Sequence, residues 1–208
     1  MANKNQALAD HGWSRKDART WGFAKIVDVL NSTQLGMIWL RLLPNNWKAV
    51  TNDPEDARQE RLDRLNVFIK FGFFQGVFAS LESTLRLILR AIDPDACAGG
   101  TAAFKNIYEC LLKSNLSGGF QDDVDLLDVL RNVRNTIHNN GVYLHKSGNN
   151  ASVTYMGTTY IFEYGKSAPY ASWAHLLEYA EKAIELLNRV VNDPVVVAHA
   201  ASINDPTA

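Results

Sequence analysis

The segment between Pro54 and Pro94 contains no other proline and has the pattern of one long helix. Asp53 can cap its first turn, and a proline and acidic residues at a helix start suit the free N–H groups and the positive end of the dipole. The first part is charged, whereas the second part is apolar nearly all round. Such a helix must be buried by several neighbours, so the chain is predicted to fold as a helical bundle around 54–92. Because its length exceeds thirty residues, a bend or a division is expected, with Gly72 and Gly76 permitting a kink or close packing.

Apolar periodicity and turn residues predict the remaining elements. Helices are expected from near Ser14 to about Leu30, over 102–113, over 121–139 and over 172–192, and strands over 152–156 and 159–164. The segment 35–43 is apolar but too short to distinguish helix from strand, and 45–53 is expected to be a loop. The fold class is therefore all-α, a helical bundle with a small β-hairpin inserted before the C-terminal helix.

Length and composition bound the organisation of the chain. It has 208 residues, of which 47% are hydrophobic, enough for one domain with its own core. We expect an N-terminal extension with a helix over 1–52, packed on a main helical domain over 53–198, and a flexible tail over 199–208. Lys plus Arg number 21 and Asp plus Glu number 22, so the net charge is 21 − 22 = −1. A bulk positive charge for coating nucleic acid or membrane is thus excluded, although a local basic site is not.

The N-terminus and the cysteines indicate a cytoplasmic protein. The first ten residues lack the apolar core of a signal peptide, and the most apolar stretch is too short to cross a bilayer. No membrane partner is therefore expected. Cys97 and Cys110 have neither paired spacing nor a neighbouring histidine cluster, so they are interpreted as reduced structural thiols.

One helix, over 121–139, carries a polar stripe beside its apolar face. Arg131, Arg134, Asn135 and His138 are separated by steps of three, four and seven, which places them on one side of a helix. The apolar residues Leu126, Leu130, Val133 and Ile137 form the adjacent stripe. The polar stripe should therefore lie at the margin of the core. Guanidinium groups bind phosphate and an imidazole can transfer a proton near neutral pH, so the pattern predicts an anion-binding site with acid–base chemistry.

A simpler interpretation of the same residues stays open. The C-terminus of a helix favours cations, so the role of Arg134 and His138 could be limited to a favourable interaction with the negative end of the helix dipole. Asn139, Asn140 and Gly141 could likewise serve only to end the helix.

The segment from Arg131 to His138 resembles the signature of the HEPN superfamily, a group of all-α domains that includes RNA-cleaving toxins and defence effectors. That signature is an arginine, a polar residue that is commonly asparagine, and a histidine after four to six intervening residues. Here Arg131-Asn132 is followed by His138 with six intervening residues, the upper limit of the range. The apolar run with Glu82, Ser83 and Arg86 is similar to the helix that faces the motif in such families.

The resemblance implies a metal-independent endoribonuclease, without cofactor, whose motif helices meet across a homodimer. In that case His138 acts as general base or general acid, and Arg131 with Arg134 holds the scissile phosphate. Asn132 or Asn135 would orient these groups or the ribose, with Asn139 also among the substrate-binding residues. Glu82 and Arg86 would support the site. The partners it implies are RNA and a cognate antitoxin.

A different class of function remains beside the enzyme. Some domains with degenerate HEPN motifs only dimerise or bind nucleotides or partners, and this chain could be such a non-catalytic module. Other site types lack support in the sequence. No phosphate-binding glycine loop occurs, and the acidic run Asp122, Asp123, Asp125 and Asp128 is better explained as a favourable helix start than as a metal site. His145 is interpreted as an exposed loop residue.

Overall fold

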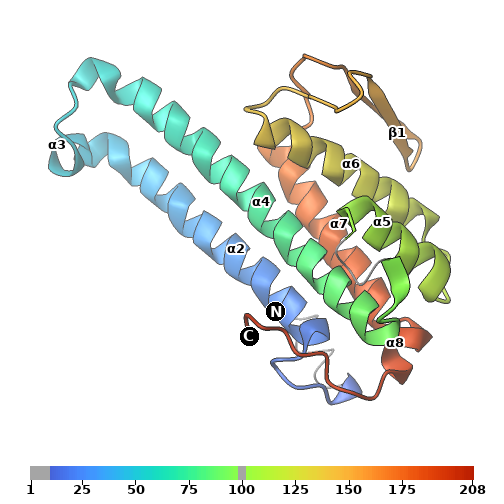
Figure 1. Ribbon diagram of the computed structural model, residues 1–208. Coiled ribbons are helices and arrows are strands. Elements are labelled where there is room, and N and C mark those ends of the chain that lie inside the picture. The colour runs from blue at the N-terminus through green and yellow to red at the C-terminus, as the bar shows by residue number, and fades with distance from the viewer. Residues whose placement is uncertain (1–9, 98–101) are drawn as a thin grey trace.

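The computed structural model describes residues 10–97 and 102–208 and is mainly α-helical, with one small antiparallel sheet in that part. In chain order the elements are α2 (Ala18–Leu42), η1 (Leu43–Asn46), α3 (Trp47–Val50), η2 (Glu55–Ala57), α4 (Arg58–Ile92), α5 (Phe104–Glu109), η4 (Cys110–Asn115), α6 (Gln121–His138), β1 (Ala151–Tyr155), β2 (Thr158–Phe162), α7 (Trp173–Val191) and α8 (Pro194–Ala198). Figure 1 shows α2 and α4 as a long hairpin that extends beyond the other helices. The prediction of a mainly helical fold with a small β-hairpin before the last long helix is confirmed.

Helix α4 is the central element, as its sequence predicts. It runs through 35 residues as one helix, so the expected division does not occur. The expected cap is wrong: the helix starts at Arg58 after the short turn η2, neither start has a side-chain cap, and Asp53 accepts from Arg61 instead. The glycines act differently from each other: a methyl group at Gly76 would lie 2.8 Å from Val29, whereas one at Gly72 would meet no described atom within 4 Å. Gly76 therefore permits α2 to approach α4 closely, and no contact within the described chain requires Gly72.

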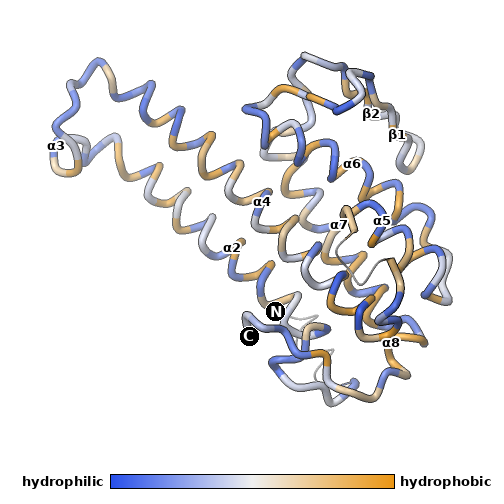
Figure 2. The backbone as a smooth tube through the Cα atoms, viewed as in Figure 1, coloured by the Kyte–Doolittle hydropathy of each residue, from blue (hydrophilic) through white to orange (hydrophobic). Residues whose placement is uncertain are grey.

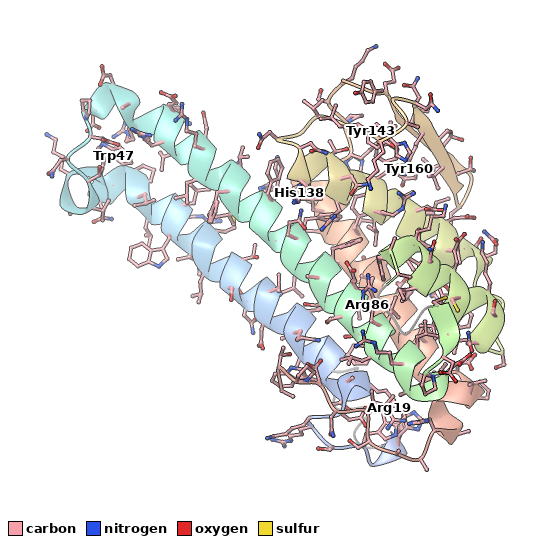
Figure 3. The ribbon with its side chains drawn as sticks, in the orientation of Figure 1. Arg19, Trp47, Arg86, His138, Tyr143 and Tyr160 are labelled. Atoms are coloured by element: carbon pink, nitrogen blue, oxygen red, sulfur yellow. The ribbon has the colours of Figure 1, made fainter. Side chains whose placement is uncertain are left out.

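Helix α2 begins later and ends later than the sequence indicates. Its N-cap is Asp17, whose carboxylate accepts from the Arg19 backbone N–H, and not Ser14. The undecided apolar segment 35–43 forms its final turns, because α4 offers a continuous helical partner beside it. The expected loop over 45–53 contains the short helix α3, whose Trp47 is buried at the tip of the hairpin and donates to the Asp53 carbonyl at 3.2 Å (Figure 3).

The other helices pack around the C-terminal half of α4. Aromatic side chains make many of these contacts: Phe78 meets Phe104 of α5 edge-on at 5.3 Å, and Phe74 meets Tyr179 of α7 at 6.2 Å. Helix α7 begins at Trp173, and Ser172 caps it by accepting from the His175 N–H, close to the predicted boundary. Between them these helices enclose a continuous apolar core.

The predicted β-hairpin is present and covers one end of the bundle. Strands β1 and β2 pair antiparallel, with Val153 opposite Tyr160, and turn at Met156-Gly157, where both residues have positive φ. Tyr160 and Phe162 on β2 point inward and are buried against Tyr170 at 5.0 and 5.3 Å between ring centroids. The hairpin thereby closes the core beside the end of α6 (Figure 3).

At the base of the molecule, a buried ion pair joins the start of α2 to the C-terminal segment. Arg19 is fully buried; its Nη2 donates to Asp17 at 2.7 Å, and the guanidinium also donates to the carbonyls of Val196, His199 and Ala201 at 2.8–3.2 Å. Asp17 in turn accepts from the Ile203 backbone N–H at 3.0 Å. The charges of this pair are thus fully hydrogen-bonded, as a buried pair requires.

Residues 199–208, expected to form a flexible tail with little to pack, lie against the body instead. Ile203 is buried in the core, and Asp205 is buried while bonded to Lys25 of α2 at 2.6 Å. The sequence could not reveal this packing, because the residues that bond to Ile203 and Asp205 are Asp17 and Lys25, which lie about 180 positions earlier. Segments 1–52 and 199–208 therefore share one core with 53–198 in the described part of the chain.

Figure 2 shows how hydropathy is distributed over this architecture, with apolar segments on the facing sides of the body helices and continuing along α2 towards α3. Within the described ranges, no helix combines the length and apolar character needed to span a membrane.

Candidate functional site

Helix α6 carries the polar stripe and is held firmly by its apolar face. Leu126, Leu130, Val133 and Ile137 are all buried, as their spacing predicts. The helix ends after His138, where Asn139 donates to the Asn135 carbonyl at 2.7 Å and Gly141 adopts a φ of +88°. The end of the helix is therefore fixed by backbone geometry, and the stripe lies along the margin of the core.

Arg131 lies in a partly buried polar cluster that includes two residues from sequence regions not connected with the motif. Its Nη2 donates to Asp128 at 2.9 Å, and the Tyr108 hydroxyl of α5 donates to the same carboxylate oxygen at 2.7 Å. Lys105 lies 3.4 Å from this carboxylate. Arg131 is thus oriented by Asp128, with about a quarter of its side chain exposed.

Electrostatics keep this cluster in one charge state. Burial alone would raise the pKa of Asp128, but hydrogen bonds from Tyr108 and Arg131 and the positive charge of Arg131 hold it below its ordinary value. Burial would lower the pKa of Arg131, and the hydrogen bond to Asp128 overcomes this and raises it. Burial and the neighbouring Asp128 raise the pKa of Tyr108 well above its usual range. The carboxylate and guanidinium are charged, and the phenol is protonated, across the physiological range.

Arg134 differs from Arg131 in having no carboxylate partner in the part of the chain that the structure describes. Its guanidinium lies over the Phe78 ring of α4, 5.9 Å from the ring centre. Its Nε is buried and has no hydrogen-bond acceptor among the described residues. Its terminal nitrogens, Nη1 and Nη2, also have no acceptor among the described residues but are not sealed from solvent, so these N–H groups are available to an anion from outside the chain.

The remaining residues of the stripe are accessible. His138 is exposed at the end of α6 and makes no hydrogen bond with any described residue, and Asn135 is half-buried. Figure 3 shows His138 at the end of α6 nearest the middle of α4. It lies seven positions after Arg131, so the two are about 10 Å apart along the helix axis. The structure therefore brings Arg131, Arg134 and His138 onto one margin, as predicted.

Asn132 lies on another side of α6. It is 1% exposed, and its Oδ1 accepts from the Tyr143 hydroxyl at 3.3 Å inside the core. In this position it cannot contact a large ligand, and it instead connects α6 to the segment that leads into the β-hairpin. Burial raises the pKa of Tyr143, with the positive charge of Arg131 opposing this, so Tyr143 lies within the field of the stripe.

Glu82 and Arg86 pair with each other on α4 at 2.7 Å. Arg86 also donates to the Ala102 carbonyl at 3.0 Å and lies over the Phe104 ring at the start of α5. Figure 3 places Arg86 well below His138, nearer to α5. Arg86 therefore holds the start of α5, and within the described part of the chain no hydrogen bond or ion pair joins Glu82 or Arg86 to Arg131, Arg134 or His138.

The other sequence candidates have structural explanations. In the acidic run, Asp123 pairs with Arg189 and Asp125 accepts from Gln121, and the described residues contain no group of three or more side chains arranged to hold a metal ion. His145 is exposed and bonds to Ser147. Cys97 and Cys110 are free thiols, and burial, with neighbouring Cys97, raises the pKa of Cys110 to about 11.

No family model, curated protein or solved structure matches this chain. The relation to the HEPN superfamily therefore stays a prediction that rests on the residues from Arg131 to His138.

Two contributors to the site could not be found from the motif. Tyr108 precedes Asp128 by twenty positions and lies on a different helix, and Tyr143 follows Asn132 by eleven. A buried tyrosine requires a partner for its hydroxyl, but no sequence spacing identifies that partner.

Proposed function

We propose that the α6 stripe binds the phosphodiester backbone of RNA and cleaves it without a metal ion. The observation that carries this proposal is Arg134, a partly buried guanidinium that has no hydrogen-bond acceptor or carboxylate partner among the described residues and is located between Arg131 and His138 on one helix face. Two guanidinium groups and one accessible imidazole are the groups that this reaction requires.

The reaction uses the ribose as nucleophile. The 2′ oxygen attacks the phosphorus while the P–O5′ bond breaks, giving a 2′,3′-cyclic phosphate and a free 5′-hydroxyl. His138 accepts the 2′-OH proton or donates a proton to O5′, and water exchanges the other proton. Arg134 and Arg131 bind the non-bridging oxygens as negative charge develops, and Asp128 fixes the direction of Arg131.

Cleavage of end-labelled RNA in EDTA tests the proposal. We expect the wild type to produce 2′,3′-cyclic ends, and His138→Ala to lose on the order of 10²- to 10⁴-fold in rate. Arg131→Ala should also cleave the RNA more slowly than the wild type. His145→Ala is the matched control, because His145 is an exposed histidine beyond the end of α6 that bonds only within its own loop. Equal cleavage by wild type, His138→Ala and Arg131→Ala would overturn the proposal.

A non-catalytic nucleotide-binding module is the second candidate, and the ion pair of Arg131 favours it. Its Nε and Nη2 both donate to Asp128, which leaves Nη1 for a phosphate. In that case the wild type binds a 2′-O-methyl RNA, which cannot react, but leaves the unmodified strand intact. Arg134→Gln should weaken this binding in either case, and fluorescence anisotropy at two salt concentrations measures it.

The biological setting forms part of the same proposal. We propose a cytoplasmic toxin or defence protein that acts on RNA and has a cognate antitoxin. Expression of the wild type should then slow growth, whereas His138→Ala should not. Slowed growth by both would assign the toxicity to another part of the protein.

A further inference from the structure

Exposed large apolar side chains are concentrated on the α2–α4 hairpin. Of fifteen such residues in the described part of the chain, eight belong to the hairpin and its tip: Leu35, Met37, Ile38, Trp39, Leu42, Val50, Val67 and Phe68. None lies on α6. A cluster of this kind marks an interaction surface, so the apolar surface available for a partner is on the hairpin.

On α2, part of this cluster follows a heptad pattern. Asp28, Ser32, Leu35, Trp39 and Leu42 are separated by four, three, four and three residues, which is the spacing of a coiled-coil seam. Leu35 and Trp39 are about 60% exposed. A different side of the helix faces α4, where Val29 meets Gly76 and Gly36 meets Ile69. Helix α2 therefore presents a second seam that nothing in the described chain covers.

Helix α4 has the same spacing on its adjoining side. Arg61, Leu65, Phe68 and Gly72 are separated by four, three and four residues, and Phe68 is 74% exposed. We refer to the two seams together, Asp28–Leu42 and Arg61–Gly72, as the hairpin face. Two seams on adjacent helices are what each half of a four-helix bundle presents to the other half.

The hairpin face also has a hollow that could receive a bulky side chain. It measures about 410 Å³ and is lined by Asp28, Val29, Ser32, Thr33, Gly36, Phe68, Ile69, Gly72 and Phe73. Gly72 weakens the helix that contains it, and no described atom approaches it. The surface thus combines protruding side chains, Phe68 and Trp39, with a hole beside them, the arrangement of knobs-into-holes packing.

Charge identifies the partner as a second copy. Gly36 and Ile69 lie side by side: a Cβ atom placed on Gly36 would be 3.3 Å from the Ile69 side chain. Asp28 lies eight residues from Gly36 towards the base, and Arg61 lies eight residues from Ile69 towards the tip. Consider a two-fold axis that passes through this level, perpendicular to the hairpin face. Eight residues of helix rise by about 12 Å, so Asp28 of one copy and Arg61 of the other lie at the same height, about 12 Å along the helices from the axis. Asp28 has no hydrogen bond or ion pair with any described residue, whereas Arg61 pairs with the exposed Asp53, an exchangeable surface contact.

The size of the surface agrees with a dimer of moderate stability. Two hairpins that overlap along about 20 residues share a face about 30 Å long and two helices wide, on the order of 600 Å² per chain. This is close to the lower limit of specific interfaces, roughly 600 Å² from each partner. We propose that two copies of this chain dimerise through the hairpin face as an antiparallel four-helix bundle, with Phe68 and Trp39 of each copy packed over Gly36 and Gly72 of the other. The inference does not rest on the proposed RNA cleavage.

Sedimentation velocity over about 1 to 100 µM tests the proposal. The wild type should shift from monomer to dimer, and Phe68→Glu should stay monomeric. Leu177→Glu is the matched control because Leu177 is 52% exposed on α7 of the body. Gly72→Leu should also abolish dimerisation while leaving thermal stability intact, since the hollow has room for the side chain in the monomer.

A charge reversal tests the geometry. Asp28→Arg and Arg61→Asp should each weaken dimerisation on the order of tenfold, and the double variant should restore it because the two charges exchange places. A wild type that stays monomeric at all concentrations would overturn the proposal. So would a wild type that binds anionic vesicles through Phe68 and does not self-associate. A dimer that Phe68→Glu leaves intact, but that a substitution on α6 disrupts, would assign dimerisation to the motif helix instead. Because RNA cleavage is assayed separately, failure of one proposal leaves the other standing.

Discussion

The two halves of α4 face different surroundings. From Phe73 to Leu89 its apolar residues are enclosed by α2, α5, α6 and α7, whereas before Phe73 the only buried side chain on the helix is Leu62, which is still 9% exposed. Helix α2 shows the same division, since all its buried residues lie between Ala18 and Ile26. A two-helix hairpin has only one seam to bury, so it cannot cover apolar residues on its other sides. The body is complete within one chain, whereas the hairpin has the composition of an interface.

The largest effect of a single substitution is expected at the base of the body. Arg19→Met should cost about 3–5 kcal/mol of unfolding free energy, because it leaves Asp17 charged and buried without its partner. Arg64→Met on the hairpin should have no measurable effect, since its pair with Glu60 is exposed. Urea denaturation measures the loss of unfolding free energy in each variant. Similar losses in the two variants would contradict the difference proposed between the body and the hairpin.

Apolar truncation should give the next contrast. Leu85→Ala should cost about 2–5 kcal/mol, because Leu85 is fully buried and the body cannot collapse around the cavity. Leu35→Ala should change the stability of the monomer by less than about 0.5 kcal/mol. Denaturation at low protein concentration isolates the monomer, and a large loss for Leu35→Ala under those conditions would mean that the hairpin is covered within the chain.

Acid should destabilise the body of the protein. Despite burial, which acts to raise them, the pKa values of Asp17, Asp128 and Asp205 are held below the ordinary 3.8 by hydrogen bonds and positive charges. A depressed folded pKa adds stability above the unfolded pKa, and this stability is lost as pH falls through the folded value. The unfolding free energy should therefore decrease below about pH 5. Asp17→Asn should flatten this dependence, which urea denaturation at a series of pH values measures.

The smallest effects distinguish two glycines one turn apart on α4. Gly72→Ala should stabilise the monomer by about 0.5–1 kcal/mol, since it improves helix propensity and meets open space. Gly76→Ala should destabilise by about 1 kcal/mol or more, because its methyl group would lie 2.8 Å from Val29. Thermal unfolding provides the measurement. Destabilisation by Gly72→Ala would show that the hollow is filled within the chain.

Much of the fold could be predicted because its signals are local. The span of α4, the cap at Ser172 and the turn at Gly157 are each specified by residues within a few positions. Helix α2 was less predictable because its final turns depend on α4 and not on their own propensity. The packing of Ile203 could not be predicted, since its partner Asp17 lies 186 positions earlier.

The candidate site shows the same limit. Helical spacing correctly placed Arg131, Arg134 and His138 on one margin, because they share one rigid element. Spacing could not reveal that Asn132 turns into the core, or that Tyr108 and Asp128 fix Arg131. Those properties depend on which helix packs where, and this information is not present in any single segment.

The contact between Asp17 and Ile203 has a consequence for the order of folding during synthesis. Residues 186 positions apart raise the contact order, so α2 cannot reach its final environment until the segment around Ile203 has left the ribosome. Until then, Asp17 and Arg19 remain solvated, and α2 has as partners only α4 and, once it has emerged, α7. Since α2 and α4 are made before α5, α6 and α7, the nascent chain exposes an apolar hairpin until these helices fold, and association with another nascent copy then competes with completion of the monomer.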